Sequence, residues 1–232
     1  MSVQESMGGA VRALAAFVHD VHERILGGDP RAQLLGTARD ASSALRDIAE
    51  DTSSTLWNVQ PRLTVRGLRE TRALDDHSTA RGVAMRFVTS SAALHQFPLL
   101  SSHVPFVRVA PVTQAMLVAD ARVVVVAGPP GTSEEPTIWA TAEPRVVARA
   151  VRVYDDLWRS ARPGVPECEE PPFTPRMVEL SFLLIDGATD RQIARRLNVS
   201  ERTVSNEVRE LVNRLGATSR IHAIAMLAGA NA

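Results

Sequence analysis

The chain has 232 residues, of which 45% are hydrophobic and 22% charged, a composition typical of globular proteins. Its 26 basic residues balance 26 acidic ones, so the overall charge gives no sign of a nucleic-acid partner. The single cysteine, Cys168, excludes an internal disulfide framework and a four-cysteine zinc site. No apolar run approaches the ~18 residues of a membrane helix, and residues 1–10 lack an export signal. We therefore expect a cytoplasmic protein with no membrane partner.

All 26 basic residues are arginine, because the chain contains no lysine. A GC-rich codon bias is the simplest cause of this composition. Its consequence is chemical, since every reaction or phosphate site that needs a lysine is excluded, including Schiff bases and P-loops.

Residues 9–27 are predicted to form one amphipathic helix within an N-terminal segment, 1–35. Its apolar residues alternate at spacings of three and four, as in a short coiled coil: Val11, Leu14, Val18, Val21 and Ile25. Packing on its own domain and a dimer seam both fit this pattern. His19 and His22 lie three apart on the same helix, but two histidines without further ligands rarely bind a metal, and we expect no metal.

Between residues 36 and 162, helical segments alternate with apolar strands. The predicted helices are 37–51, 64–80 and 144–159, and the predicted strands are 55–59, 83–88, 106–109, 115–118, 122–127 and 137–140. The strands 115–118 and 122–127 are close enough for a hairpin that turns at Asp120-Ala121. This alternation predicts an α/β domain with a mixed sheet and flanking helices.

The segment 160–172, SARPGVPECEEPP, is the clearest break in the chain. Its prolines and glycine cannot continue a helix or a central strand, which predicts a linker at 163–172. From residue 172 onward, 8 arginines stand against 6 acidic residues, while the rest of the chain has 18 against 20. The neutral total therefore conceals a mildly basic C-terminal domain at 173–232.

The C-terminal domain is predicted to contain four helices, because four capping residues precede helical patterns: Thr174, Thr189, Ser200 and Ser219. The second helix, 190–197, is short and is followed after a brief turn by a longer third helix with polar residues on its free face. This arrangement is typical of a helix-turn-helix.

The same residues resemble the LuxR/NarL-type helix-turn-helix domain of bacterial transcription regulators. The resemblance runs without a gap and includes TPR at the start, an Asp-Gly turn, IARRL, VSERTV, RLG and the SR before the last helix. It implies an all-α domain of four helices whose third helix enters the major groove. It also implies dimerisation through the fourth helix on two half-sites of double-stranded DNA.

Carried over by position, the resemblance implies that Ser205, Asn206 and Arg209 face bases. Arginine suits guanine and asparagine suits adenine. The residues implied to lie near phosphates are Thr189, Arg191, Arg202 and Thr203, since helix N-termini and arginines hold phosphates. Two positions depart from the family, which commonly has lysine in place of Ser205 and histidine in place of Glu207. We expect Glu207 to face a phosphate unfavourably, which makes dimerisation more necessary.

The α/β domain at 36–162, called the front domain below, lacks the lysine of a phosphoacceptor receiver domain. It also lacks the aromatic cluster of an acyl-homoserine-lactone domain. Residues 112–126 instead resemble the strand pair of phospholipase D-like domains, whose pattern is His-x-Lys-x4-Asp. In this alignment Thr113 replaces the histidine, Ala115 replaces the lysine, and only Asp120 remains. Degenerate domains of this kind resemble those of TrmB-like and actinobacterial LuxR-type regulators. The resemblance covers about 36–162 and implies an effector or dimer module.

Enzyme activity is not expected, because such a phosphodiesterase needs an imidazole nucleophile and a cation on the phosphoryl oxygens. No cofactor is expected either. Ligands of open α/β sheets lie beyond the carboxyl ends of strands. The candidate ligand residues there are Trp57, Asn58, Thr89, Ser90 and Thr113, which suit a small neutral effector. The alternative is that no ligand exists and that the domain only holds two C-terminal domains at a fixed spacing.

These features favour a dimeric, DNA-binding transcription regulator with a non-catalytic front domain. The alternative is a protein-interaction module whose helix-turn-helix binds another regulator rather than DNA.

Overall fold

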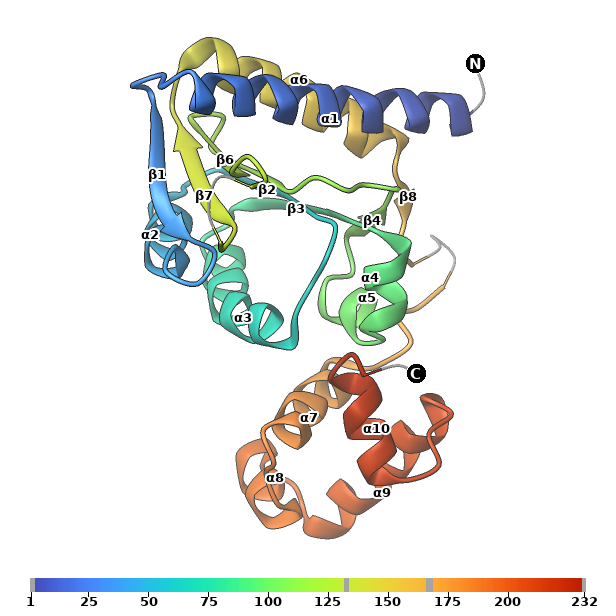
Figure 1. Cartoon of the computed structure of the whole chain (residues 1–232). Coiled ribbons are helices and arrows are strands. Elements are labelled where there is room, and N and C mark those ends of the chain that lie inside the picture. The colour runs from blue at the N-terminus through green and yellow to red at the C-terminus, as the bar shows by residue number, and fades with distance from the viewer. Residues whose placement is uncertain (1–2, 132–133, 166–168, 231–232) are drawn as a thin grey trace. The chain divides into compact units, whose positions relative to one another are not determined.

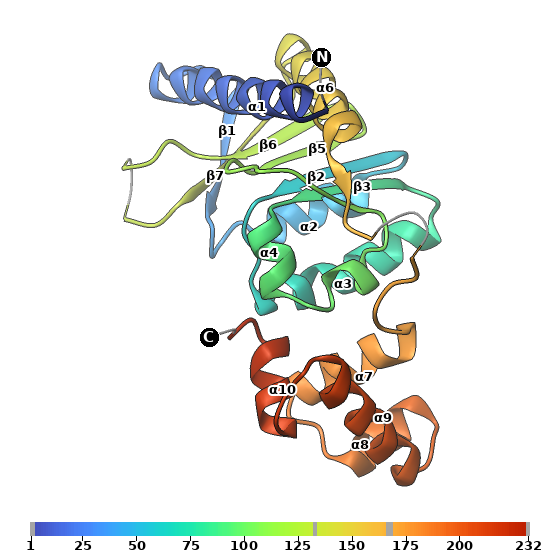
Figure 2. The ribbon, with the colours of Figure 1, turned by 90° about the vertical axis from the view of Figure 1, so that its right-hand side faces the viewer.

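The computed structural model describes residues 3–131, 134–165 and 169–230, and only the backbone of residues 3, 66 and 69–75. Cys168 and part of the predicted linker 163–172 lie outside the described residues. The chain divides into two compact units (Figure 1, Figure 2). The sheet unit comprises the residues up to Leu63, Glu70–Ser90 and Arg108–Arg162, and the helical unit comprises Thr64–Arg69, Ser91–Val107 and the residues from Pro163. No helix in the described residues is long and apolar enough to cross a membrane.

The described strands form one mixed sheet in the order β1-β7-β6-β5-β2-β3-β4-β8. They are β1 (Ala32–Thr37), β2 (Thr55–Gln60), β3 (Ala84–Thr89), β4 (Val107–Val109), β5 (Met116–Ala119), β6 (Val123–Ala127), β7 (Thr137–Thr141) and β8 (Arg162–Pro163). β2 and β3 are parallel, whereas β2, β5, β6, β7 and β1 pair antiparallel in succession. The mixed sheet predicted from the sequence is confirmed.

β1 was not predicted from the sequence, in which the helix that follows was expected to start at residue 37. The strand lies at an edge of the sheet and has a bulge between Leu34 and Gly36. Leu34 is 51% exposed, so the strand lacks the continuous apolar pattern of a buried one. The helix, α2 (Ser42–Asp51), starts only after a turn in which Thr37 Oγ1 donates to Asp40 over 2.8 Å.

Two helices, α1 (Val3–Leu26) and α6 (Pro144–Ser160), lie side by side over one face of the sheet (Figure 1). They enclose the larger core of the unit, where Leu14, Val18 and Tyr154 are at most 1% exposed. Val11 and Ile25 pack against the same core. The apolar stripe of α1 is therefore buried in its own unit. Of the two alternatives that the sequence left open for this stripe, packing on its own domain is the one seen here.

The opposite face of the sheet carries α2 and α3 (Val65–Ala80) and has a much smaller core (Figure 2). Its buried residues are Ala49, Leu56, Val83 and Ala119. The sheet is consequently closed on one side and only partly covered on the other.

The helical unit contains α4 (Ser91–Gln96) and α5 (Leu100–His103), together with α7 (Pro175–Ile185), α8 (Asp190–Leu197), α9 (Glu201–Arg214) and α10 (Arg220–Leu227). The four predicted C-terminal helices are confirmed. α4 and α5 were not predicted. The sequence analysis assigned residues 91–107 to the α/β domain, whereas in the structure they pack with the C-terminal helices. Leu99 lies in the core with Phe173, and Ser102 Oγ accepts the Phe173 N–H over 3.1 Å.

The predicted hairpin between β5 and β6 is present and turns at Asp120 and Ala121, whose φ angles are 50° and 51°. Positive φ at both central residues gives the turn type that matches the twist of a hairpin. The Asp120 carboxylate accepts hydrogen bonds from the N–H groups of Ser53, Ser54 and Thr55 and from both serine hydroxyls, over 2.7–3.0 Å. It thus attaches the start of β2 to the hairpin.

These hydrogen bonds make Asp120 a stabilising acid, and we expect Asp120→Asn to lower the free energy of unfolding by about 1–3 kcal/mol at pH 7. Burial raises the pKa of Asp120, but the donors from residues 53–55 outweigh it and hold that pKa well below its usual value. A lowered carboxyl pKa stabilises the fold above about pH 4 and loses this effect in stronger acid. The difference between the two proteins in urea unfolding should therefore shrink below pH 4.

Asp47→Asn is the matched control, because Asp47 is exposed on α2. Equal unfolding free energies for the two variants at pH 7 would contradict the structural role of Asp120.

Candidate nucleic-acid interface

The helix-turn-helix is formed by α8 and α9, and local capping fixes both ends of the turn. Thr189 and Gln192 form a capping box at the start of α8, and Ser200 Oγ accepts the Thr203 N–H over 3.1 Å at the start of α9. Between them, Asn198 ends α8 in the left-handed region with φ 54°. Asparagine tolerates that conformation, so the chain can reverse there without a glycine.

One side of α9 is buried in the core of the unit through Val204, Val208 and Leu211. The residues at spacings of three and four on the other side are all exposed: Arg202, Ser205, Asn206 and Arg209. The structure therefore brings the three predicted base-facing residues together on one free face of one helix, with Arg202 beside them.

Hydrogen bonds orient this face. Arg209 Nη1 donates to Asn206 Oδ1 over 3.1 Å, and Ser205 Oγ donates to Asp190 Oδ2 over 3.3 Å. Two of the four predicted phosphate contacts, Thr189 and Thr203, use their hydroxyls in the helix caps. The Thr189 hydroxyl donates to Gln192, and the Thr203 hydroxyl bonds to Ser200. In the pair of Ser200 and Thr203 either hydroxyl can be the donor.

Asp190 connects three helices, a role that the sequence did not indicate. Its carboxylate accepts Ser205 from α9 and forms an ion pair with Arg220 at the start of α10. Arg220 also donates to the Ala188 carbonyl over 3.4 Å. In the sequence, Asp190 is only an acidic residue in the first turn of a helix, a common placement that stabilises the helix dipole.

Glu207 does not behave as the sequence predicted. Its carboxylate forms an ion pair with Arg176 in the first turn of α7, and its side chain is only 14% exposed. The expectation that Glu207 faces a phosphate was wrong, because residue 207 lies on the flank of α9 that packs towards α7. The acid neutralises an arginine of its own domain.

Ion pairing leaves the remaining basic charge of this domain on two helices. Arg176, Arg214 and Arg220 pair with Glu207, Glu210 and Asp190. The arginines that form no ion pair with any described residue are all exposed on α8 and α9: Arg191, Arg195, Arg196, Arg202 and Arg209. The positive potential of the domain is therefore concentrated on the helix-turn-helix.

The five candidate ligand residues of the sheet unit are not brought together in one pocket of the described residues. Trp57 stacks on Tyr154 at 5.2 Å between ring centroids, on the α6 side of the sheet, whereas Asn58 lines a cavity on the other side. The hydroxyls of Thr89 and Ser90 donate to the carbonyls of residues 60 and 61 over 2.7 Å. Thr113 is exposed. The sequence placed all five at strand ends, but alternate residues of a strand face opposite sides.

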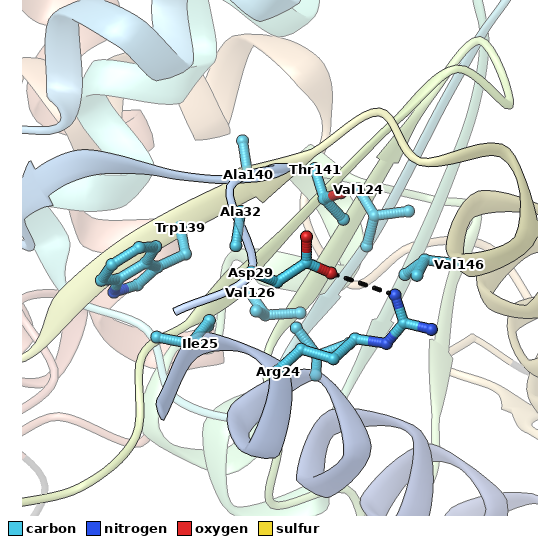
Figure 3. Close-up of a pocket in the computed structure, with 11 residues that line it drawn as sticks. Arg24, Ile25, Asp29, Ala32, Val124, Val126, Trp139, Ala140, Thr141 and Val146 are labelled. Carbon is cyan, nitrogen blue, oxygen red and sulfur yellow. Dashed lines mark hydrogen bonds and ion pairs between the residues drawn. The ribbon is translucent and has the colours of Figure 1, made fainter. Parts of the chain in front are cut away.

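A small pocket lies between the end of α1 and the strands β6 and β7 (Figure 3). Its volume is about 10 Å³, room for no more than one water molecule. At its rim Arg24 pairs with Asp29 over 3.3 Å and with Glu143 over 3.7 Å. Burial opposes ionisation of Glu143, but N–H donors at the start of α6 outweigh it and lower its pKa. Ion pairs and the N-terminal cap of α6 thus border this pocket.

The two histidines of α1 have no metal-binding surroundings. His22 Nε2 bonds to the Ala127 carbonyl over 2.9 Å, and no group of three metal-binding side chains exists among the described residues.

Comparison with known proteins agrees with this geometry. Residues 171–227 match the family of bacterial regulatory proteins known as the luxR family. This segment is a LuxR-type helix-turn-helix domain. The resemblance found in the sequence is confirmed for this part of the chain, and DNA binding is the function that the domain implies. No curated protein matches the chain significantly.

Three solved structures show weaker likeness. TrmBL2, an archaeal chromatin protein with a novel mode of DNA binding, has a TM-score of 0.48 and 14% identity over 68% of this chain and 66% of its own. NucT from Helicobacter pylori has a TM-score of 0.47 and 12% identity over 57% of this chain and 98% of its own. VqmA of Vibrio cholera, in a complex with ligand and DNA, has a TM-score of 0.26 and 18% identity over 50% and 49%.

The chain thus spans slightly less than two thirds of TrmBL2 and about half of VqmA. Because the three TM-scores lie below 0.5, these likenesses carry no argument about what this chain binds.

The exposed face of α9 leads to a test of specificity. We expect Arg209→Ala to weaken binding to the preferred operator by about 1–3 kcal/mol and to relax discrimination at one base pair. Arg191→Ala should weaken binding to all sequences alike, since a phosphate contact carries no sequence information. Operators selected from random duplexes and a scrambled duplex, titrated with each variant, distinguish these outcomes. Arg214→Ala is the control, because Arg214 is paired with Glu210. Unchanged operator affinity of Arg209→Ala would show that the recognition-helix assignment is wrong.

Proposed function

We propose that the chain is a non-catalytic transcription regulator that binds operator DNA as a homodimer through α9, with the sheet unit as its effector and assembly domain. The observation that carries the DNA-binding part is the set of exposed, unpaired arginines on α8 and α9, beside the face that holds Ser205, Asn206 and Arg209. A helix-turn-helix with this charge distribution has both parts that operators require: phosphate contacts for position and base contacts for sequence.

The non-catalytic part of the proposal is supported by the positions that would hold a phosphodiesterase site. Thr113 is exposed and has no ring nitrogen to attack phosphorus, and Ala115 provides no cation. Asp120, the remaining member of the pattern, uses both carboxylate oxygens to hold residues 53–55. It serves the fold rather than a reaction.

A salt titration of DNA binding by the full chain tests the DNA-binding part. Binding should fall steeply with salt, because each neutralised phosphate releases a counterion and gives a slope of about −0.9 in a plot of log affinity against log salt. Because α8 and α9 carry several arginines, we expect the plot of log affinity against log salt to be steeper than about −4 for the dimer. Binding that does not depend on salt, or no DNA binding at all, would favour the protein-interaction alternative.

The homodimer is supported by the surface of α10, where Ile221 is 80% exposed. Burying this side chain against a partner would contribute about 25 cal/mol per Å² of apolar surface removed from water. The stripe of α1 is already buried in the sheet unit, so α10 is the better candidate for the interface. We expect Ile221→Glu to shift the full chain to monomer in analytical ultracentrifugation. It should also lower affinity for an operator with two half-sites by about tenfold or more.

Leu26→Glu is the control for this variant, since Leu26 is 60% exposed on α1. Affinity of Ile221→Glu for a single half-site should stay unchanged. An Ile221→Glu protein that remains a dimer would contradict the assignment of the interface to α10.

A further inference from the structure

The less covered face of the sheet holds a cavity of about 250 Å³ under α2. Its floor consists of side chains from β2, β5, β6 and β7, and α2 contributes Leu45 and Ala49. An apolar cavity of roughly 150 Å³ is large enough for benzene, so this one has room for a substituted ring. It is much larger than the pocket of Figure 3, which also adjoins β6 and β7 and measures about 10 Å³.

Strand register determines which side chains reach the cavity. Asn58 pairs with Leu117, Leu117 with Val125, and Ala127 with Ile138, which places cross-strand neighbours on a continuous floor. Along β2, alternate residues point to this side, and both Asn58 and Gln60 line the cavity. Trp57 points the other way, to Tyr154.

The two amides are the polar groups of an otherwise apolar lining. The backbone carbonyls of Asn58 and Gln60 accept Tyr154 Oη and Thr89 Oγ1, but neither side-chain amide makes a hydrogen bond to any described residue. No described residue in the lining is charged. Apolar walls with a few convergent polar groups are typical of small-molecule sites, and the absence of a cation disfavours an anionic ligand.

Part of the space exists because three lining residues are alanines, Ala49, Ala115 and Ala127. Ala115 stands where the phospholipase D-like pattern has its lysine. A long cationic side chain there would point into this cavity, because Ala115 itself lines it. The position is filled here by the smallest apolar side chain that has a Cβ.

We propose that this cavity binds an uncharged, largely apolar small molecule about the size of one substituted ring, whose amide, carbonyl or hydroxyl group hydrogen-bonds to Asn58 and Gln60. The proposal deepens the effector part of the proposed function. It is tested on the full chain without DNA, whereas DNA binding is tested without ligand, so either can fail alone.

Benzamide and benzoate are the probes, because they have the same shape and differ in charge. In isothermal titration with the full chain, benzamide should bind at least tenfold more tightly than benzoate at pH 7. Equal binding of the two, or no binding of benzamide at millimolar concentration, would overturn the proposal.

Two variants locate the site. Ala115→Leu fills the cavity and should lower benzamide affinity at least tenfold, while the melting temperature stays equal or rises. Asn58→Leu removes one amide and should lower benzamide affinity at least threefold without weakening the binding of toluene. Ala16→Leu, at an exposed position of α1 on the other face of the sheet, is the matched control and should bind benzamide like the unmodified chain. Unchanged benzamide affinity in Ala115→Leu would place the probe elsewhere and overturn the assignment.

Discussion

The sheet of this protein is buried unequally on its two faces, and much of its chemistry depends on that inequality. α1 and α6 close one face with large side chains such as Leu14, Phe17 and Leu157, each at most 1% exposed. This is the main hydrophobic contribution to the unit, since each such side chain adds about 1.5–3 kcal/mol when fully buried. The apolar stripe of α1 is buried in the same core. The stripe is therefore not available for a dimer contact, for which α10 is the proposed surface.

Asp120 fixes the geometry of the open face. Its carboxylate attaches the start of β2 to the β5–β6 hairpin, and the register that follows places Leu56 opposite Ala119 and Asn58 opposite Leu117. The one residue retained from a catalytic pattern is thus a structural acid. Ala115, at the position where the phospholipase D-like pattern has a lysine, lines the cavity on this face with an uncharged side chain.

Local signals in the sequence predicted most of this fold, whereas tertiary contacts could not be predicted from it. Thr174, Thr189, Ser200 and Ser219 marked helix starts because a cap acts within three residues of itself. β1 was missed because an exposed edge strand has no clear apolar pattern, and α4 and α5 because short helices are weakly periodic. The base-facing positions Ser205, Asn206 and Arg209 came from the resemblance to LuxR-type domains, and the structure has all three exposed on α9. The Glu207–Arg176 pair could not be predicted, since those residues are 31 apart in sequence and meet only in the packed unit.

The neutral total charge of the chain does not oppose DNA binding, because screening limits electrostatic effects to about 8–10 Å at physiological salt. Within that range, the potential at the helix-turn-helix depends on which arginines the nearby acidic residues pair with. Glu207, Glu210 and Asp190 each pair with an arginine outside the free arginines of α8 and α9, so they leave the potential of those helices positive. Asp190 does more, because its carboxylate contacts both Ser205 on the base-facing side and Arg220 on α10. The recognition face and the start of α10, the helix of the proposed dimer interface, therefore share one carboxylate.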